Sequence, residues 1–323
     1  MLSRPFEPGP ELTAALTRAQ GNAGAYATLS GQYRSAAGTG TVFLSAAEKQ
    51  AYLAARFPAT FAAISMALSH LLDAYQGSDW TSLLDAGCGP ATASFAASGH
   101  LPGLQTIVLA DADQSWFAIA KDLANACGNG AIADANAVAG PLSMVRAQAD
   151  LVVAAYVLNE SASKEQDTLL DTLWNAAGQA ILIVEPGTPH GFATIRRVRD
   201  RLITYGAVIA SPCPHQAPCP LRDPDWCHFS VRLNRSAAHR RAKGAKLAYE
   251  DEKFSFVAAL RNPLDLKSYR ARIIKRPVKH GGHVRLDLCT EGGAGPRIIA
   301  RSQGPHYRQA RDAEWGDIWP PHP

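Results

Sequence analysis

The chain has 323 residues, 47% of them hydrophobic, which is enough for one large or two smaller domains with a packed core and excludes general disorder. Its net charge of +4 conceals a division, because residues 1–190 carry 8 Lys/Arg against 16 Asp/Glu, whereas residues 191–323 carry 24 against 12. The basic C-terminal part indicates a polyanionic partner, with nucleic acid as the first candidate and a solvated basic surface as the alternative.

Residues 1–78 are expected to form a helical N-terminal region. Ser45 and Glu48 have the spacing of a capping box, and apolar side chains then recur every three or four positions. Pro58 should kink this helix or split it in two, because proline lacks the N–H of the helical ladder. Residues 1–24 hold no apolar segment of the length that a signal peptide or a membrane span requires, so we expect neither export nor a membrane partner.

A strand, a glycine turn and a helix are predicted to follow one another from residue 82. The apolar strand 82–86 leads into Gly87-Cys88-Gly89, and a second apolar strand ends at Asp111, 24 residues after Gly87. Glycines let the backbone approach a ligand closely, and an acidic side chain at the end of the second strand can accept both ribose hydroxyls. The pattern therefore predicts a nucleotide site at the carboxyl ends of these strands.

Two further apolar runs, at residues 150–155 and 179–185, are expected to be strands covered on both faces. Helical stretches at residues 115–127 and 163–177 lie between the predicted strands. This alternation predicts a doubly wound, Rossmann-like α/β sheet in a domain that spans residues 79–262.

Four cysteines are expected to form one ligand set. Three lie in one loop with the spacing C-x5-C-x7-C, and the fourth follows 62 residues later; they are Cys213, Cys219, Cys227 and Cys289. Prolines directly after the first two pre-organise the loop, which suits thiolates that converge on a metal ion or an iron–sulfur cluster. Two disulfides or unrelated core cysteines are the alternatives, and zinc stays open because His215 and His228 lie beside the cysteines. The remaining two, Cys88 and Cys127, are expected to be small buried hydrophobic side chains.

Two parts of the basic half precede its C-terminal strands: a cysteine-rich insertion, residues 206–250, and the helix before it. Residues 232–246 contain seven Arg, Lys or His side chains in fifteen positions. Such a run is usually a solvated face, but its density beside the cysteine loop favours phosphate contacts. The side chains expected to bind RNA are Arg235, Arg240, Arg241, Lys243 and Lys246, and the arginines of the preceding helix are Arg196, Arg197, Arg199 and Arg201.

Residues 263–323 are expected to form a basic, β-rich C-terminal region that supplies the fourth cysteine. Residues 283–289 and 297–301 alternate between apolar and polar side chains and are joined by a Gly-rich connection, which predicts a hairpin. Strands are also expected at 254–260 and 271–276. The pattern does not decide whether these strands complete the main sheet or build a small separate barrel.

A specific combination of motifs extends over roughly residues 45–320. The motifs are Arg56-Phe-Pro-Ala-Thr60, Asp85-Ala-Gly-Cys-Gly-Pro90, Ala155-Tyr-Val-Leu-Asn-Glu160, Val184-Glu-Pro-Gly-Thr-Pro189, the clustered cysteines, Leu286-Asp-Leu-Cys-Thr290 and Trp315-Gly-Asp-x-Trp319. This combination resembles the mitochondrial small-ribosomal-subunit assembly methyltransferase-like family, which also has bacterial members. The cysteine spacing is its most specific element.

The resemblance implies a class I methyltransferase fold, bound S-adenosylmethionine and a [4Fe-4S] cluster on the four cysteines. It also implies a place in maturation of the small ribosomal subunit, with ribosomal RNA as partner and substrate, in the cytoplasm of a bacterium or in a mitochondrion. Thr92 stands where a dinucleotide fingerprint has its third glycine, so S-adenosylmethionine is expected rather than NAD. The residues expected to contact it are Asp85, Gly87, Gly89, Asp111 and Tyr156.

The residues after strand 150–155 carry no recognised catalytic motif. The Asn/Asp-Pro-Pro-Tyr/Phe motif is absent, and no cysteine nucleophile occurs between Cys127 and Cys213. Asn159 and Glu160 are candidates for orienting or deprotonating a substrate, and a helix cap or a cofactor contact is the alternative. Three functions therefore stay open: an rRNA methyltransferase, an assembly factor that uses both ligands structurally, and a zinc-containing RNA-binding protein. Sequence-specific DNA binding is not expected.

Overall fold

The computed structural model describes residues 6–35, 43–77, 79–263 and 265–321. Within these residues the chain forms two compact units. The first unit is drawn from residues 1–69, 79–185 and 231–252, and the second from residues 70–78, 186–230 and 253–323.

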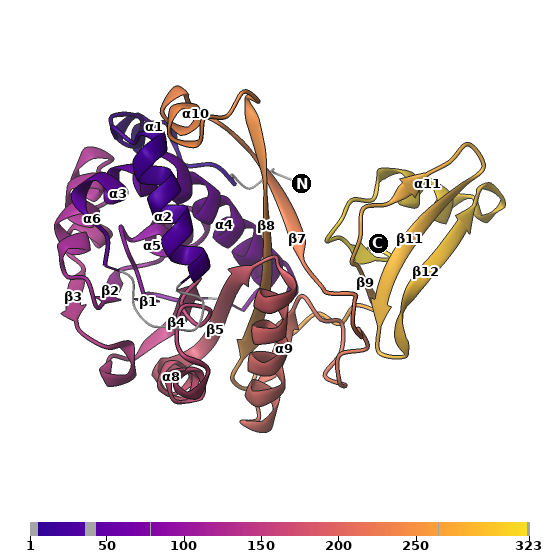
Figure 1. Ribbon diagram of the computed structural model, residues 1–323. Helices are drawn as coiled ribbons and strands as arrows, with labels where there is room; N and C mark the ends of the chain where they lie inside the picture. Colours follow the sequence, from indigo (N-terminus) through magenta and orange to yellow (C-terminus); the bar gives the residue numbers. More distant parts are fainter. Residues whose placement is uncertain (1–5, 36–42, 78, 264, 322–323) are drawn as a thin grey trace. The chain divides into compact units, whose positions relative to one another are not determined.

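A parallel sheet forms the centre of the first unit (Figure 1). Its strands lie in the order β3-β2-β1-β4-β5, each parallel to its neighbours. They are β1 (Ser82–Ala86), β2 (Thr106–Asp111), β3 (Asn136–Ala139), β4 (Ala149–Ala155) and β5 (Ala177–Pro186). The intervening helices are α5 (Thr92–His100), α6 (Ser115–Ala126), α7 (Gly130–Ala133), a 3-10 turn (Leu142–Met144) and α8 (Ser163–Ala176). The expected apolar strands are present, and Leu84, Val152 and Ile181 are fully buried in them.

The complete eight-stranded sheet has the order β3-β2-β1-β4-β5-β8-β6, with β7 paired to β8. The last three strands are β6 (Val208–Ser211), β7 (Phe229–Asn234) and β8 (Tyr249–Leu260), and β6 runs antiparallel to β8. Five parallel strands followed by an antiparallel pair form the doubly wound class I methyltransferase arrangement that the sequence predicts.

The N-terminal region is helical, as expected. It contains α1 (Pro10–Thr17), α2 (Ala23–Ser35) and one long helical run made of α3 (Ala46–Ala51), a π-helix (Tyr52–Arg56) and α4 (Phe57–Ala74). The capping box is present, because the Ser45 N–H donates to Glu48 Oε2 at 2.7 Å and the Glu48 N–H to Ser45 Oγ at 3.3 Å. The helical run is not split at Pro58, because α4 begins at Phe57 and continues through it, and the turn before α4 is a wider π-helix.

The helical run from Ala46 to Ala74 is long and apolar enough to cross a membrane. However, 78% of its most apolar part is buried inside the protein. Burial among the other helices and the sheet therefore accounts for its composition.

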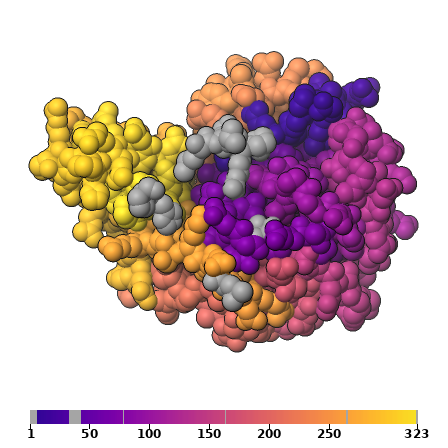
Figure 2. All heavy atoms as spheres, turned by 180° about the vertical axis from the view of Figure 1, so that it is seen from behind, coloured from indigo at the N-terminus to yellow at the C-terminus, as the bar shows by residue number. Residues whose placement is uncertain are grey.

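Helix α10 (Ala237–Lys243) packs beside α1 and α2 within the first unit (Figures 1 and 2). Ser236 caps it by accepting a hydrogen bond from the His239 N–H at 3.1 Å. The His239 side chain is buried, and Lys243 Nζ lies 5.4 Å from the centre of the Tyr26 ring. One side of the basic run is therefore a packing surface.

The second unit combines α9 (Pro189–Thr204), the cysteine loop (residues 212–228) and a separate five-stranded sheet. The strands of this sheet are β9 (Ala271–Ile273), β10 (Val278–Lys279), β11 (His283–Thr290), β12 (Gly293–Ala300) and β13 (Ile318–Trp319). A 3-10 turn (Arg301–Gln303) and α11 (Pro305–Asp312) lie between β12 and β13 in the sequence. The predicted hairpin is confirmed as β11–β12, and the C-terminal strands have their own core of Ile273, Val284, Leu286, Ile299 and Trp319. They therefore form a sheet apart from the main one.

Candidate functional site

The glycine turn after β1 is held by backbone hydrogen bonds and by one close contact. The N–H groups of Gly87 and Cys88 donate to the carbonyl of Ala110 on β2 at 2.8 and 3.1 Å. Gly87 has φ +70°, and a Cβ there would lie 2.4 Å from Cγ2 of Val157, whereas a Cβ on Gly89 would meet nothing within 4 Å. The space next to Gly87 is thus filled by the protein itself, and the open space lies at Gly89.

Two aspartates flank this turn and have different partners. Asp111, at the end of β2, accepts hydrogen bonds from the N–H groups of Gly89 and Asp113, both at 2.8 Å. Asp85 is buried and accepts from the N–H and the hydroxyl of Ser94 at 2.9 and 2.8 Å. Burial raises the pKa of Asp85 to about 7 and also raises the pKa of Asp111. Asp111 therefore lies against the turn, whereas Asp85 anchors the start of α5.

Tyr156 belongs to a cluster that joins the π-helix to β8. Its backbone has φ 65°, an uncommon conformation for a residue other than glycine, and its hydroxyl donates to Glu252 Oε1 at 3.2 Å. The Arg56 guanidinium pairs with Glu252 at 3.1 Å and lies 5.6 Å from the centre of the Tyr156 ring. Burial alone would lower the pKa of Arg56, but the Glu252 carboxylate raises it well above its usual value. The cluster holds the chain just after β4 in a strained conformation.

Two carboxyl groups, the buried Glu185 and the half-buried Glu160, lie near the same end of β4. Glu185 Oε1 accepts hydrogen bonds from the N–H groups of Leu158 and Asn159 at 2.9 and 3.2 Å. In the described part of the chain, Glu185 Oε2 and Asn159 Oδ1 are buried without a hydrogen-bond partner. Burial raises the pKa of Glu185 to about 8, and burial together with the charge of Asp111 raises the pKa of Glu160 to about 8. Unpartnered buried polar atoms are costly, so this edge suits a polar ligand or bound water.

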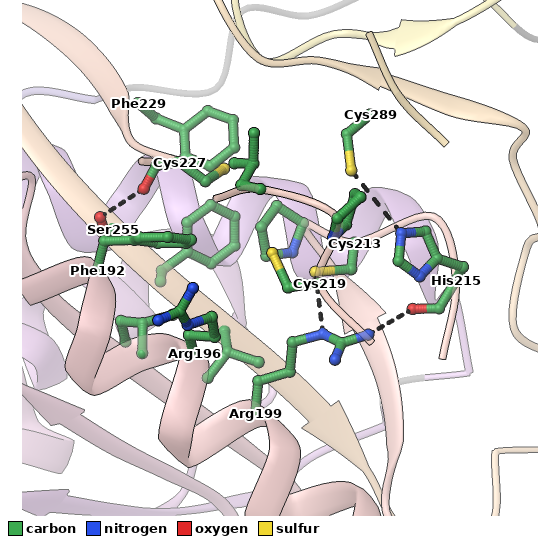
Figure 3. Close-up of a pocket in the computed structure, with 16 residues that line it drawn as sticks. Phe192, Arg196, Arg199, Cys213, His215, Cys219, Cys227, Phe229, Ser255 and Cys289 are labelled. Atoms are coloured by element: carbon green, nitrogen blue, oxygen red, sulfur yellow. Dashed lines mark hydrogen bonds between the residues drawn. The ribbon is translucent and has the colours of Figure 1, made fainter. Parts of the chain in front are cut away.

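The four predicted cysteine ligands line one pocket in the second unit (Figure 3). All four are free cysteines, so the disulfide alternative is wrong. Aromatic side chains of Phe192, Phe229 and Phe256 form part of the pocket wall. Burial raises the pKa of Cys213 and Cys227, and it raises the pKa of Cys289 to about 12. Without a ligand the thiols of Cys213, Cys227 and Cys289 are therefore protonated at neutral pH.

Arg199 enters this pocket from α9 (Figure 3). Its Nε donates to Cys213 Sγ at 3.3 Å, and its guanidinium also donates to the carbonyls of His215 and Ala217 at 3.1 and 2.6 Å. The side chain is 3% exposed. Arg199, which the sequence places among the basic residues of the C-terminal part, is therefore turned away from solvent and toward the cysteines.

The two histidines near the cysteines have different positions. His215 lines the pocket, with Nε2 at 3.8 Å from Cys289 Sγ and Nδ1 at 3.1 Å from the Ala217 carbonyl. His228 instead stacks on Trp226, with the ring centres 5.2 Å apart. Among the described residues, no three His, Cys, Asp or Glu side chains converge closely enough to hold a single metal ion.

The remaining two cysteines are not both buried. Cys88 is 3% exposed, as expected for a small core side chain. Cys127 is half-buried and lies where α6 ends, so the expectation that it is a core residue is wrong. A helix end is often close to solvent, which is the physical reason for its exposure.

The predicted RNA-binding side chains separate into two groups. Arg235 and Lys243 both pair with Glu250, whose other partner is His239. Arg240, Arg241 and Lys246 are exposed, and the described residues offer them no carboxylate partner. The second group alone is available to bind phosphate without breaking an ion pair.

Several residues of both sites were not predicted as site residues. Arg56 and Glu185 fall in motifs that carry the resemblance, but Glu252 has no local signal, because it meets Arg56 across 196 positions of sequence. Arg199 does have a local signal in the sequence, because it lies on the helix face that also buries Phe192 and Ile195. A charged side chain on an apolar helix face needs a partner, and here the partner is the cysteine loop.

Comparison with known proteins identifies the family. Residues 46–320 match the family described as mitochondrial small ribosomal subunit Rsm22. Human "Ribosome assembly protein METTL17, mitochondrial" is 28% identical over 291 residues, which cover 83% of this chain and 62% of the human protein. "Ribosome assembly protein RSM22, mitochondrial" of Saccharomyces cerevisiae is 24% identical over 245 residues, 45% of this chain and 39% of the yeast protein. The chain thus spans less than two thirds of the length of these relatives.

Among solved structures, the magnesium protoporphyrin IX methyltransferase of Synechocystis PCC 6803 has a TM-score of 0.43 and 13% identity, over 78% of this chain and 100% of that chain. The family match covers most of the residues that build both units, including the glycine turn and all four pocket cysteines. The chain therefore belongs to the mitochondrial small ribosomal subunit Rsm22 family.

Proposed function

We propose that this protein assists assembly of the small ribosomal subunit, with a [4Fe-4S] cluster on the four pocket cysteines and S-adenosylmethionine at the carboxyl edge of the parallel sheet. The observation that carries the proposal is the cysteine pocket, in which four free thiols line one cavity in a member of the Rsm22 family. The human and yeast relatives are named as ribosome assembly proteins, which supports this role. Ribosomal RNA is the proposed partner, in a bacterial cytoplasm or in a mitochondrion.

We favour a cluster over a single zinc ion for the cysteine pocket. Zinc requires four ligand atoms at about 2.0–2.3 Å from one point, and no three candidate ligands among the described residues converge in this way. A cubane is larger than an ion and takes one thiolate at each iron, so its ligands stand apart around a cavity. The bound cluster would supply a link between β11 and the cysteine loop, with no iron left open for catalysis.

The carboxyl edge of the sheet fits S-adenosylmethionine. Gly89 borders open space, and the Asp111 carboxylate beside it is suited to ribose hydroxyls. Asn159 Oδ1 and Glu185 Oε2 are buried acceptors without protein partners in the described chain. The sulfonium of the cofactor is a cation, so its binding would favour the charged form of the nearby carboxyl groups, whose pKa values burial raises in the free protein. When bound, the cofactor would supply a methyl group.

Arg240, Arg241 and Lys246 are the proposed phosphate ligands for ribosomal RNA. They are exposed on and just after α10, and none of them is held by Glu250. Arg235 and Lys243, by contrast, are proposed to position this surface through their ion pairs rather than to bind RNA themselves.

Methyl transfer to ribosomal RNA is the second candidate function. It is favoured by Glu160, whose pKa of about 8 suits a group that exchanges protons near neutral pH. Glu160 follows β4 by five residues, beyond Tyr156 with its φ of 65°, and it is the group proposed to exchange a proton with a substrate.

Binding and transfer can be measured on the same protein. Asp111→Asn should weaken S-adenosylmethionine binding about 10-fold or more in calorimetry, because a charge-assisted hydrogen bond contributes about 1.5–3 kcal/mol. Asp122→Asn, at an exposed position on α6, is the matched control. We expect the protein to bind immature small subunits without methylating them. Stoichiometric transfer that Glu160→Gln abolishes would establish the second function, and failure to bind these particles would refute the first.

A further inference from the structure

One buried guanidinium joins two parts of the cysteine pocket (Figure 3). Arg199 donates from Nε to Cys213 Sγ and from its terminal nitrogen to the carbonyls of His215 and Ala217. Both carbonyls belong to the loop that runs from Cys213 to Cys219. The same side chain therefore fixes the first sulfur and the path of the backbone to the second.

The charge of Arg199 lacks a buried counter-charge. Its carboxylate partner among the described residues is Asp200, at 2.9 Å, and the Asp200 side chain is 55% exposed. Arginine stays protonated in proteins, and a buried charge is costly unless it is paired. Four thiolates around an iron–sulfur core make a ligated centre anionic, so a cluster would provide the missing negative charge next to this guanidinium.

Arg196 and Tyr269 do not share this geometry. Arg272 is a second buried guanidinium, but it donates to the carbonyls of Pro212 and Gly316 rather than to a sulfur. Arg196 lies one turn earlier on α9 and lines the same pocket, but its guanidinium lies 5.7 Å from the centre of the Phe192 ring. Tyr269 supports the cysteine loop from another side, because its hydroxyl donates to the carbonyls of Pro212 and Cys213 at 3.0 and 3.1 Å. Tyr269 thus holds backbone, whereas Arg199 also reaches a sulfur.

We propose that Arg199 is a positioning residue of the cysteine centre: it orients the Cys213 sulfur, fixes the loop to Cys219 and balances the negative charge of a bound iron–sulfur cluster. The inference rests on the proposed cluster. Hydrogen bonds to ligand sulfurs and nearby positive charge stabilise the reduced cluster and raise its reduction potential. Arg199 should therefore affect both the retention of iron and the potential of the cluster.

The test uses full-length protein purified without oxygen, with four variants: Arg199→Gln, Arg199→Lys, Arg196→Gln and Tyr269→Phe. The rate at which a ferrous chelator removes iron should rise about 10–100-fold in Arg199→Gln and stay near the wild-type rate in Arg196→Gln. A dye-coupled redox titration should place the potential of Arg199→Gln below that of the wild type. Arg199→Lys keeps the charge and should restore part of the shift, whereas Tyr269→Phe should leave the potential unchanged.

Each result separates the two proposals. Wild-type protein without iron would refute the cluster and the role of Arg199 together. A loaded wild type with equal potentials and iron-release rates in Arg199→Gln would refute the role of Arg199 alone. The same potential shift in Tyr269→Phe would also refute it, since loop support would then explain the effect. A folded Arg199→Gln variant that never retains iron, beside a fully loaded Arg196→Gln, supports the proposal.

Discussion

The two candidate sites differ in the source of partners for their polar groups. At the sheet edge of the first unit the protein supplies most of them, since Ser94 binds Asp85, Gly89 binds Asp111 and Arg56 binds Glu252, whereas Asn159 Oδ1 and Glu185 Oε2 have no partner in the described chain. In the pocket of the second unit, four thiols line a cavity with aromatic walls, and Arg199 is the cation that reaches one of their sulfurs among the described residues.

This difference predicts different dependence on ligands. A site whose polar groups satisfy one another can fold before its ligand arrives, so ligand binding adds modestly to stability. Burial raises the pKa values of Cys213, Cys227 and Cys289, and these thiols would form the main cross-link of the pocket when the proposed metal centre displaced their protons. If both proposed ligands bind, the first unit should therefore tolerate loss of S-adenosylmethionine, whereas the second should not tolerate loss of the cluster.

The largest effect is expected from Cys289→Ser, because Cys289 ties β11 to the cysteine loop. The variant should lose its absorbance near 400 nm and most of its iron, about four atoms per chain in the wild type. The free energy of unfolding of the second unit should fall by about 4 kcal/mol or more, which is the range reached when a structural metal is lost. Cys213→Ser, Cys219→Ser and Cys227→Ser should behave alike.

The controls for this prediction are Cys88→Ser and Cys127→Ser, which lie in the first unit and outside the pocket. Both should keep the iron and the colour. A colourless wild type with one bound zinc would contradict the cluster, and full colour in Cys289→Ser would show that another side chain, with His215 as the next candidate, is the fourth ligand.

A smaller effect is expected from filling the glycine turn of the first unit. Gly87→Ala combines φ +70° with a Cβ 2.4 Å from Val157, so it should cost about 2–5 kcal/mol of stability with no ligand present. Gly89→Ala has φ +49° and open space, so it should cost only about 1 kcal/mol. Urea titration measures both.

Measuring the affinity of both variants for S-adenosylmethionine distinguishes the roles of the two glycines. Gly89→Ala should weaken S-adenosylmethionine binding more than its small loss of stability explains, because its methyl group enters the open space. Adding Val157→Ala to Gly87→Ala should recover the part of the loss that comes from the clash, but not the part that comes from φ. Equal stabilities of Gly87→Ala and Gly89→Ala would show that the contact with Val157 is unimportant.

The pH dependence of the first unit follows from its buried carboxyl groups. The pKa of Glu185 is raised from about 4.3 in an unfolded chain to about 8 in the folded protein. Between these values the folded state binds the extra proton, so this contribution is complete below pH 4.3 and is lost as the pH rises through about 8. Stability without ligand should therefore fall over this window.

Glu185→Gln isolates that contribution. The amide oxygen can still accept from Leu158 and Asn159, but it does not titrate. The slope of unfolding free energy between pH 6 and pH 8 should become shallower by up to about 1.4 kcal/mol per pH unit. The pKa of Asp150 is lowered, because its hydrogen bonds outweigh the effect of burial, so Asp150 is ionised in both states above about pH 5 and Asp150→Asn should leave the slope between pH 6 and pH 8 unchanged. An unchanged slope in Glu185→Gln would show that Glu185 ionises normally.

What could be predicted from the sequence depended on the range of the interaction. Apolar runs become β4 and β5 because a strand buried on both faces needs only its own residues to be apolar. The Ser45–Glu48 capping box is similarly local. The cysteine spacing also identified four residues that share a pocket. Closely spaced cysteines are a recognisable signal in a sequence, because few structural features other than a metal site require them.

The parts that sequence could not predict depend on contacts between distant segments. Nothing near Glu252 marks it as the partner of Arg56, and nothing near Gly87 shows that Val157 fills the space beside it. In the same way, the sequence does not show which of the several arginines on this helix contacts Cys213, and the structure identifies it as Arg199. A basic run therefore predicts net charge but not which of its charges are already paired.

The smallest effect expected concerns RNA, and it compares free cations with paired ones on the same surface. Replacing Arg240, Arg241 and Lys246 by Ala should reduce the slope of log affinity against log salt for structured RNA by about 2–3, near one for each phosphate that the variant no longer neutralises. Replacing Arg235 and Lys243 should change this slope little, because Glu250 already neutralises them, although it should lower stability. Equal slope changes in both variants would show that RNA displaces Glu250. A slope near zero in the wild type would leave the basic surface without a role in nucleic-acid binding.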